Sequence, residues 1–116
     1  MEFNEILIIA EGKHLNPSIP CNQTISSGCA ADLMSDVLTL DTPNAVLITG
    51  LCNPQVIRTA LMAEISVIVF VRGKKPSKET LDLANSENIP LITSKFGMFE
   101  LCGRLHQACL PGTYEA

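Results

Sequence analysis

The chain has 116 residues, of which 47% are hydrophobic and 17% charged, and its formal net charge is −4. This length predicts a single domain that spans residues 1–116 and has its own hydrophobic core. The negative net charge argues against general nucleic-acid binding. No run approaches the roughly 18 apolar residues of a membrane span, and the apolar run 6–10 is too short for a secretory signal. Five cysteines without such a signal indicate free thiols in a reduced, cytoplasmic protein.

The first 43 residues are predicted to hold two strands, an irregular crossing between them and a short helix. Residues 5–10 are predicted as the first strand. Gly12 and the prolines at positions 17 and 20 then favour an extended, irregular crossing. Residues 24–27 are predicted as a short strand that ends near Gly28. Apolar residues at helical spacing from about Ala30 to Leu38 predict a short amphipathic helix.

Residues 44–76 form the unit around which the chain is organised. Residues 44–48 and 66–71 are continuous apolar runs, typical of strands covered on both faces, as in a parallel sheet. Between them, Asn53 suits the N-cap and Pro54 the first turn of a helix that continues to about Glu64.

The last third repeats this alternation of strand and helix. Ser77 is a candidate N-cap for a helix that ends before Asn88, and residues 90–93 are predicted as the last strand. Ser94 is a candidate cap for a helix over about residues 96–109, and a loose tail to Ala116 is expected. The alternation predicts an α/β fold in three layers, α/β/α, with a mainly parallel central sheet of about five strands.

A ligand site is predicted where the strands end. In parallel sheets, ligands bind outside the carboxyl ends of the strands, and loops 49–53, 72–77 and 93–95 have that placement. Five of the eight basic residues lie in or beside these loops, at positions 72, 74, 75, 78 and 95. They favour a small ligand that carries phosphate or carboxylate. The alternative is a solvated lysine-rich turn. The predicted binding residues are Thr49, Gly50, Asn53, Arg72, Gly73, Lys74, Thr93 and Ser94.

No motif indicates catalysis, a metal or a cofactor. The glycines match neither a P-loop nor a dinucleotide fingerprint, the cysteine spacing does not suit zinc, and no nucleophile elbow is present. Cys102 and Cys109 are predicted to share one helix face and to pack as core residues. Cys52 precedes a helix start, where its thiolate would be favoured, but no histidine is near it in sequence to support a reactive role.

Four segments resemble the small stand-alone proteins of the DRTGG domain family. They are residues 31–38 (ADLMSDVL), 48–51 (ITGL), 53–60 (NPQVIRTA) and 69–74 (VFVRGK). The literal Asp-Arg-Thr-Gly-Gly string is absent, and only residues 49–50 and 72–73 echo it. The resemblance implies an α/β/α fold similar to the N-terminal domain of HPr kinase/phosphorylase. It also implies a regulatory or dimerising role, like that of the domains that accompany CBS domains in regulated pyrophosphatases. Kinase activity is not carried over, because the chain lacks the P-loop.

We therefore expect a non-catalytic regulatory module that forms a homodimer and binds a small anionic ligand, a nucleotide or a phosphorylated metabolite. The alternative is a protein-binding adaptor whose basic loop docks an acidic partner. The family's association with iron-hydrogenase gene neighbourhoods links that alternative to redox or hydrogenase-type metabolism. An enzyme would need a catalytic group that the sequence does not reveal. No cofactor, metal, nucleic acid or membrane is expected as a partner.

Overall fold

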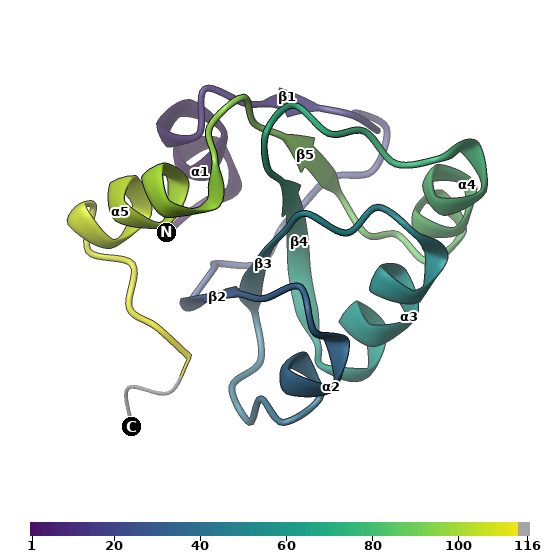
Figure 1. Ribbon diagram of the computed structural model, residues 1–116, viewed down its shortest axis with the longest axis horizontal. Coiled ribbons are helices and arrows are strands. Elements are labelled where there is room, and N and C mark those ends of the chain that lie inside the picture. The colour runs from purple at the N-terminus through teal and green to yellow at the C-terminus, as the bar shows by residue number, and fades with distance from the viewer. Residues whose placement is uncertain (114–116) are drawn as a thin grey trace.

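The computed structural model describes residues 1–113, which form one five-stranded sheet flanked by helices (Figure 1). The strands are β1 (Lys13–His14), β2 (Ser27–Ala30), β3 (Ala45–Thr49), β4 (Ile65–Phe70) and β5 (Leu91–Thr93). The helices are α1 (Phe3–Ile9), α2 (Met34–Val37), α3 (Pro54–Met62), α4 (Lys78–Ser86) and α5 (Met98–Gln107). The strand order is β1-β5-β4-β3-β2, and only β1 runs antiparallel to its neighbour. The predicted α/β fold with a mainly parallel sheet is confirmed.

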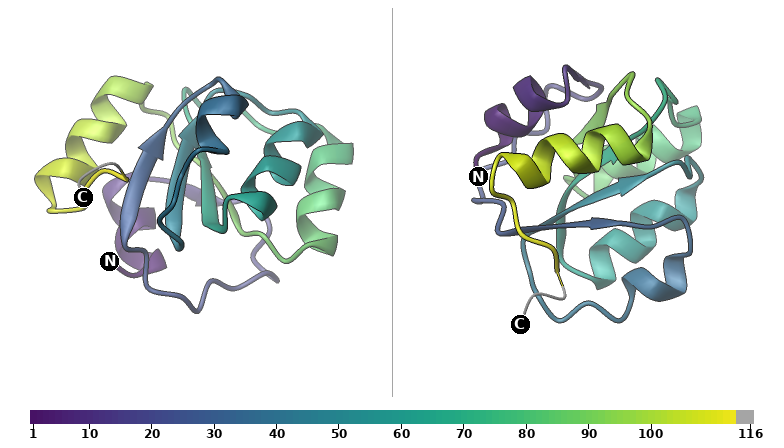
Figure 2. Two further views of the ribbon diagram at one scale, coloured as in Figure 1. Left: turned by 90° about the horizontal axis from the view of Figure 1, so that it is seen from below. Right: turned by 60° about the vertical axis from the view of Figure 1, so that its left-hand side comes forward.

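The helices form two outer layers, as Figure 2 shows from two further directions. Helices α1 and α5 cover one face, where Ile6 and Leu101 pack with Val46 and Val69 of the sheet. Helices α2, α3 and α4 cover the other face. Strand residues alternate between these two clusters because successive side chains point to opposite faces. The sheet is therefore buried on both sides, as the continuous apolar strands predicted.

The central unit lies where the sequence places it. Every residue of β3 and β4 is buried, and α3 begins at Pro54 with Asn53 in the N-cap position. The Asn53 side chain makes no capping hydrogen bond. Ser77 caps α4 as predicted, with its Oγ accepting a hydrogen bond of 3.2 Å from the Thr80 amide.

The predicted first strand at residues 5–10 is wrong, because this segment belongs to helix α1. Its buried residues Phe3, Ile6 and Ala10 are three and four apart, which places them on one helical face. Ile8, between them in sequence, leaves 74% of its surface exposed. The Glu2 amide donates to the Glu5 carboxylate at 3.0 Å and closes the first turn.

The crossing after α1 is anchored by a buried side chain. Asn16 Nδ2 donates to the Ile89 carbonyl at 2.9 Å, and Asn16 Oδ1 accepts from the Leu91 amide at 2.8 Å. These bonds hold the crossing against the start of β5, and the short strand β1 pairs with β5 just before them in sequence. The sequence predicted an irregular crossing here and missed β1.

Strand β2 and helix α2 differ in extent from the prediction. The strand expected at residues 24–27 is found at Ser27–Ala30, so Gly28 lies inside it. The helix expected over about residues 30–38 is a single turn, Met34–Val37. The segment after Ala30 is instead a loop at the carboxyl end of β2, and this places Asp32 near the ends of the neighbouring strands.

The last helix begins later than predicted. Gly97, not Ser94, occupies the N-cap of α5. Cys109 lies beyond the helix end, exposed and with a φ of +74°, so the predicted core position for it is wrong, while Cys102 is half-buried on α5. The expectation of a loose tail falls mainly on residues 114–116, which lie outside the described residues. Within residues 1–113, no helix is long and apolar enough to cross a bilayer.

Candidate ligand-binding site

The three predicted loops follow strands that are neighbours in the sheet. Strands β3, β4 and β5 are adjacent and parallel, so their carboxyl ends meet at one edge. The Val71 amide donates to the Thr49 carbonyl at 3.1 Å, and the Gly73 amide donates to the Ser94 carbonyl at 2.7 Å. These bonds join the loops after β3, β4 and β5 into one surface.

Gly50, directly after β3, is the centre of a polar cluster at this edge. Its amide donates to Asp32 Oδ1 at 2.8 Å, and its carbonyl accepts a hydrogen bond from Lys74 Nζ at 3.1 Å. The Thr49 hydroxyl donates to the same Asp32 oxygen at 3.0 Å. Asp32 and Lys74 are thus both hydrogen-bonded to the backbone of Gly50.

Arg72 and Asp32 stand on the open side of Gly50. A Cβ atom on Gly50 would lie 3.5 Å from the Arg72 Nη2 atom and 3.6 Å from both carboxylate oxygens of Asp32. Both charged residues are exposed, whereas Gly50 is buried. Because Gly50 has no side chain, the space between the guanidinium and the carboxylate stays open.

The backbone at Arg72 adopts the left-handed conformation, with a φ of +58° that costs energy in a residue other than glycine. Gly73 follows with a φ of +66°. The Arg72 amide donates to the Phe96 carbonyl at 2.8 Å, which holds this turn against the loop after β5. The turn directs the chain back across the edge, and Lys74 consequently reaches Gly50.

The backbone amides around Gly50 and Gly73 are already engaged. Gly50 donates to Asp32, Leu51 donates to the Thr49 hydroxyl, and residues 71–74 all donate to backbone carbonyls. Gly50 and Gly73 are both among the predicted binding residues. Their own amides have partners within the protein, whereas the side chains of Arg72 and Lys74 are exposed.

Three predicted hydroxyl groups make bonds that stabilise the loops. Thr49 bonds to Asp32, Thr93 Oγ1 donates to the Lys74 carbonyl at 2.7 Å, and Ser94 Oγ donates to the Ala10 carbonyl at 2.7 Å. All three residues are buried. Asn53 is exposed at the start of α3, and the next residue, Pro54, has no amide hydrogen to offer.

The five predicted basic residues divide into two groups. Lys78 pairs with Asp82 at 3.8 Å, and Lys95 pairs with Glu11 at 3.0 Å. No ion pair within residues 1–113 involves the exposed side chains at positions 72, 74 and 75. Of the five predicted basic residues, the three without an ion pair therefore all lie in the loop after β4.

Asp32 is the residue of this cluster that sequence reasoning missed. It follows β2, so it lies at the same edge as the loops after β3 and β4. The sequence feature that could have identified Asp32 is its place two residues after the end of a strand. That signal was lost because the strand was predicted three residues too early and Asp32 was assigned to a helix.

The Cys52 thiol is not activated. Burial raises the pKa of Cys52, and the nearby Lys74 charge offsets only part of that rise. The expectation that the helix start favours its thiolate is therefore wrong. Among residues 1–113, no three histidine, cysteine or acidic side chains gather closely enough to hold a metal ion.

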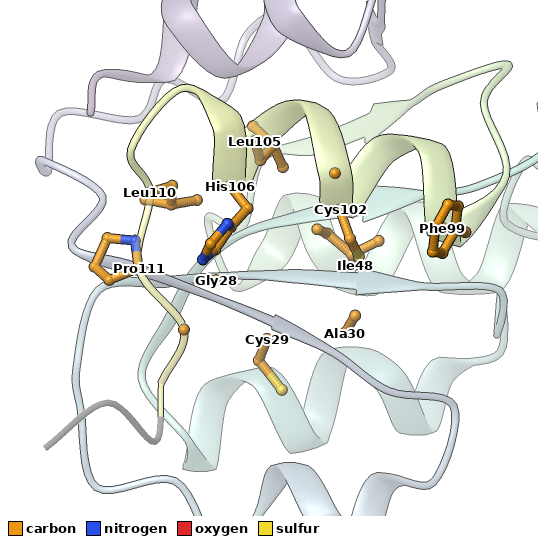
Figure 3. A pocket seen from close by; sticks show the side chains of 12 residues that line it. Gly28, Cys29, Ala30, Ile48, Phe99, Cys102, Leu105, His106, Leu110 and Pro111 are labelled. Atoms are coloured by element: carbon orange, nitrogen blue, oxygen red, sulfur yellow. The ribbon is translucent and has the colours of Figure 1, made fainter.

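A separate, apolar hollow of about 390 Å³ lies between α5 and the edge strand β2. Its lining includes Ile48, Leu105 and Leu110, together with the half-buried Cys102. Figure 3 shows side chains of α5 that extend over the β2 strand, with Phe99 at one end of the hollow. Phe99 leaves 93% of its surface exposed.

The sequence of this chain matches a known domain family. The sequence model of the DRTGG domain family matches residues 22–108. The chain belongs to the DRTGG domain family. The matched segment includes the Gly50 cluster, whereas α1 and β1 lie outside it. A search of curated protein sequences finds no match.

A solved structure has the same fold as this DRTGG domain. It is the crystal structure of the CBS and DRTGG domains of the regulatory region of Clostridium perfringens pyrophosphatase, complexed with its activator, diadenosine tetraphosphate. The TM-score is 0.67 at 18% sequence identity, and the similarity covers 97% of this chain. The similarity spans about half of the crystallised regulatory region, 49% of that chain.

Proposed function

We propose that this DRTGG domain is a non-catalytic regulatory module that binds a small, phosphate-bearing ligand at the carboxyl edge of the sheet. The observation that carries the proposal is the position of Arg72 and Lys74, both exposed and both beside the Gly50 peptide. Charged hydrogen bonds from arginine and lysine are the usual means of holding phosphate. The nucleotide in the related pyrophosphatase regulatory region supports a ligand of this class.

The test is a thermal-shift screen of nucleotides and phosphorylated metabolites, followed by titration calorimetry of each hit. Changing Arg72 or Lys74 to Ala is expected to weaken binding about tenfold or more, because each removes a charged hydrogen bond of about 1.5–3 kcal/mol. Lys78→Ala is the matched control, because it removes the same charge type from a lysine that pairs with Asp82. A hit that binds both variants as tightly as the wild type would refute this location.

We further propose that the chain forms a homodimer through the face made by α5 and β2. An interface with twofold symmetry uses the same patch on both copies, so the patch must complement itself. This face has both parts: Phe99 protrudes, and the apolar hollow beside it could receive an aromatic ring from a second copy. Aromatic side chains are enriched at the centres of such interfaces.

Light scattering after size-exclusion chromatography tests the dimer, because one chain has a mass of 12.5 kDa. We expect twice that mass at micromolar concentration and a shift toward the monomer for Phe99→Ala. Ile8→Ala, which trims an exposed apolar residue of α1, is expected to leave the dimer intact. A wild-type monomer would refute the dimer, and the exposed Phe99 would then favour the alternative of a protein-binding adaptor.

A further inference from the structure

Asp32 places a negative charge inside the site proposed for an anion. A simple anion gains from Arg72 and Lys74 but is repelled by the nearby carboxylate of Asp32. A site selected for anions alone would exclude this residue. Its hydrogen bonds to Thr49 and Gly50 explain the position of one carboxylate oxygen and leave the second oxygen to be explained.

One oxygen of Asp32 is occupied and the other is available. Oδ1 accepts hydrogen bonds from Thr49 and Gly50, which fix the orientation of the carboxylate. Within residues 1–113, neither a hydrogen bond nor an ion pair reaches Oδ2. Because two hydrogen bonds already hold Oδ1, the Asp32 side chain would lose little additional conformational entropy when a ligand binds to Oδ2. The exposed residue thus offers an oriented acceptor to solvent.

The acceptor and the cation lie on the same side of Gly50. The position of a Cβ atom on Gly50 is 3.5 Å from the Arg72 guanidinium and 3.6 Å from both Asp32 oxygens, in contact range of each. A ligand group above Gly50 would therefore meet a donor and an acceptor together. Only a ligand with an anionic group and hydrogen-bond donors close to one another satisfies both.

We infer that Asp32 accepts hydrogen bonds from vicinal hydroxyl groups of the ligand while Arg72 and Lys74 bind its phosphate, so that the site selects ribonucleotides over plain phosphates. This inference rests on the proposed anion site and adds a specificity residue to it. Hydroxyl pairs of a ribose are good donors to a carboxylate, as in other α/β folds that bind nucleotides at strand ends.

Calorimetry with three probes tests the inference: ADP, 2′,3′-dideoxy-ADP and pyrophosphate, all in EDTA so that no metal ion bridges carboxylate and phosphate. The wild type is expected to bind ADP about tenfold or more tightly than the dideoxy analogue, the value of one hydrogen bond to a charged group. Asp32→Asn is expected to bring that ratio close to one and to strengthen pyrophosphate binding, because it removes the negative charge. Asp41→Asn, at another exposed aspartate, is expected to preserve the ratio.

Asp32→Asn keeps an oxygen that can accept the bonds from Thr49 and Gly50, so the loop is expected to fold. Gly50→Ala is the second variant, because its Cβ meets no atom closer than 3.5 Å and occupies the space between Arg72 and Asp32. It is expected to reduce ADP affinity about tenfold or more without lowering the melting temperature.

The outcomes separate the two proposals. Equal affinity of the wild type for ADP and its dideoxy analogue, or a ratio that persists in Asp32→Asn, would overturn the role of Asp32 and leave the anion site in place. Binding of pyrophosphate without either nucleotide would have the same meaning. Failure of all three probes to bind would overturn the anion site at the Gly50 cluster and the role of Asp32 with it.

Discussion

The buried side chain of Asn16 offers a strong test of how the N-terminal crossing is held to the sheet. Its amide bonds to the Ile89 carbonyl, the Leu91 amide and the Asn85 side chain, at 2.9, 2.8 and 3.1 Å. Asn16→Ala removes all three bonds. Ile89 and Leu91 are at most 4% exposed, so their backbone groups lose a partner where water has little access.

The cost follows from the number of groups left without a partner. Each buried, unsatisfied backbone group costs about 1–3 kcal/mol, so the two together predict a loss of about 2–6 kcal/mol. Domains of this size are stable by about 5–15 kcal/mol, so the variant should be severely destabilised yet still measurable at low temperature. Far-UV circular dichroism in urea is the suitable assay, because the chain has no tryptophan.

Asn22→Ala is the matched control, since the same side chain is removed from an exposed position. Its stability is expected to change by less than about 0.5 kcal/mol. A loss below about 1 kcal/mol for Asn16→Ala would refute the reasoning. It would mean that water or a shift of the chain replaces the lost bonds.

Two further predictions concern pH and packing. Burial lowers the pKa of His14, so the folded state binds protons less readily than the unfolded chain. The stability that the fold gains from keeping His14 neutral is fully present above the ordinary histidine pKa of 6.5. This stability is lost as pH falls through 6.5 toward the lower pKa of His14 in the folded state. Urea midpoints at pH 7.5 and 5.5 should therefore differ less in His14→Gln than in the wild type, while an unchanged difference would contradict the assignment. Gly12→Ala is expected to cost about 1–3 kcal/mol, because its Cβ would lie 2.5 Å from a buried side chain of β5. Gly103→Ala, in open space on α5, should instead stabilise the fold by up to about 1 kcal/mol; similar melting temperatures for these two variants would contradict the packing described.

The parts of the fold that were predictable are those that the sequence determines locally. Strands β3 and β4 are buried on both faces, so their apolar runs identify them without knowledge of their neighbours. Pro54 and Ser77 mark the starts of α3 and α4 through their own backbone preferences. These elements also place the loops after β3 and β4, and the sequence therefore located the edge that carries the Gly50 cluster.

The errors arose where tertiary contacts decide the outcome. A short apolar run fits a strand or a buried helix equally well, and residues 6–10 became helical because Ile6 and Ala10 pack against the sheet. Strand β2 lies at the edge of the sheet, and its sequence from Ser27 to Ala30 has only a weak apolar pattern. The resulting shift concealed Asp32, the residue that gives the site its mixed charge.

The first 21 residues lie outside the segment that matches the family, but they are part of the folded structure. The family match begins at residue 22, yet Phe3, Ile6 and Ala10 complete one of the two cores, and β1 pairs along the far edge of the sheet. The Ile25 amide also donates to the Met1 carbonyl at 2.7 Å. In this chain, the segment that matches the family is therefore shorter than the unit that folds. A fragment cut at the boundary of the family match would expose apolar surface on the α1 side of the sheet. In this chain, the segment just upstream of the family match therefore belongs to the folded unit rather than to a linker.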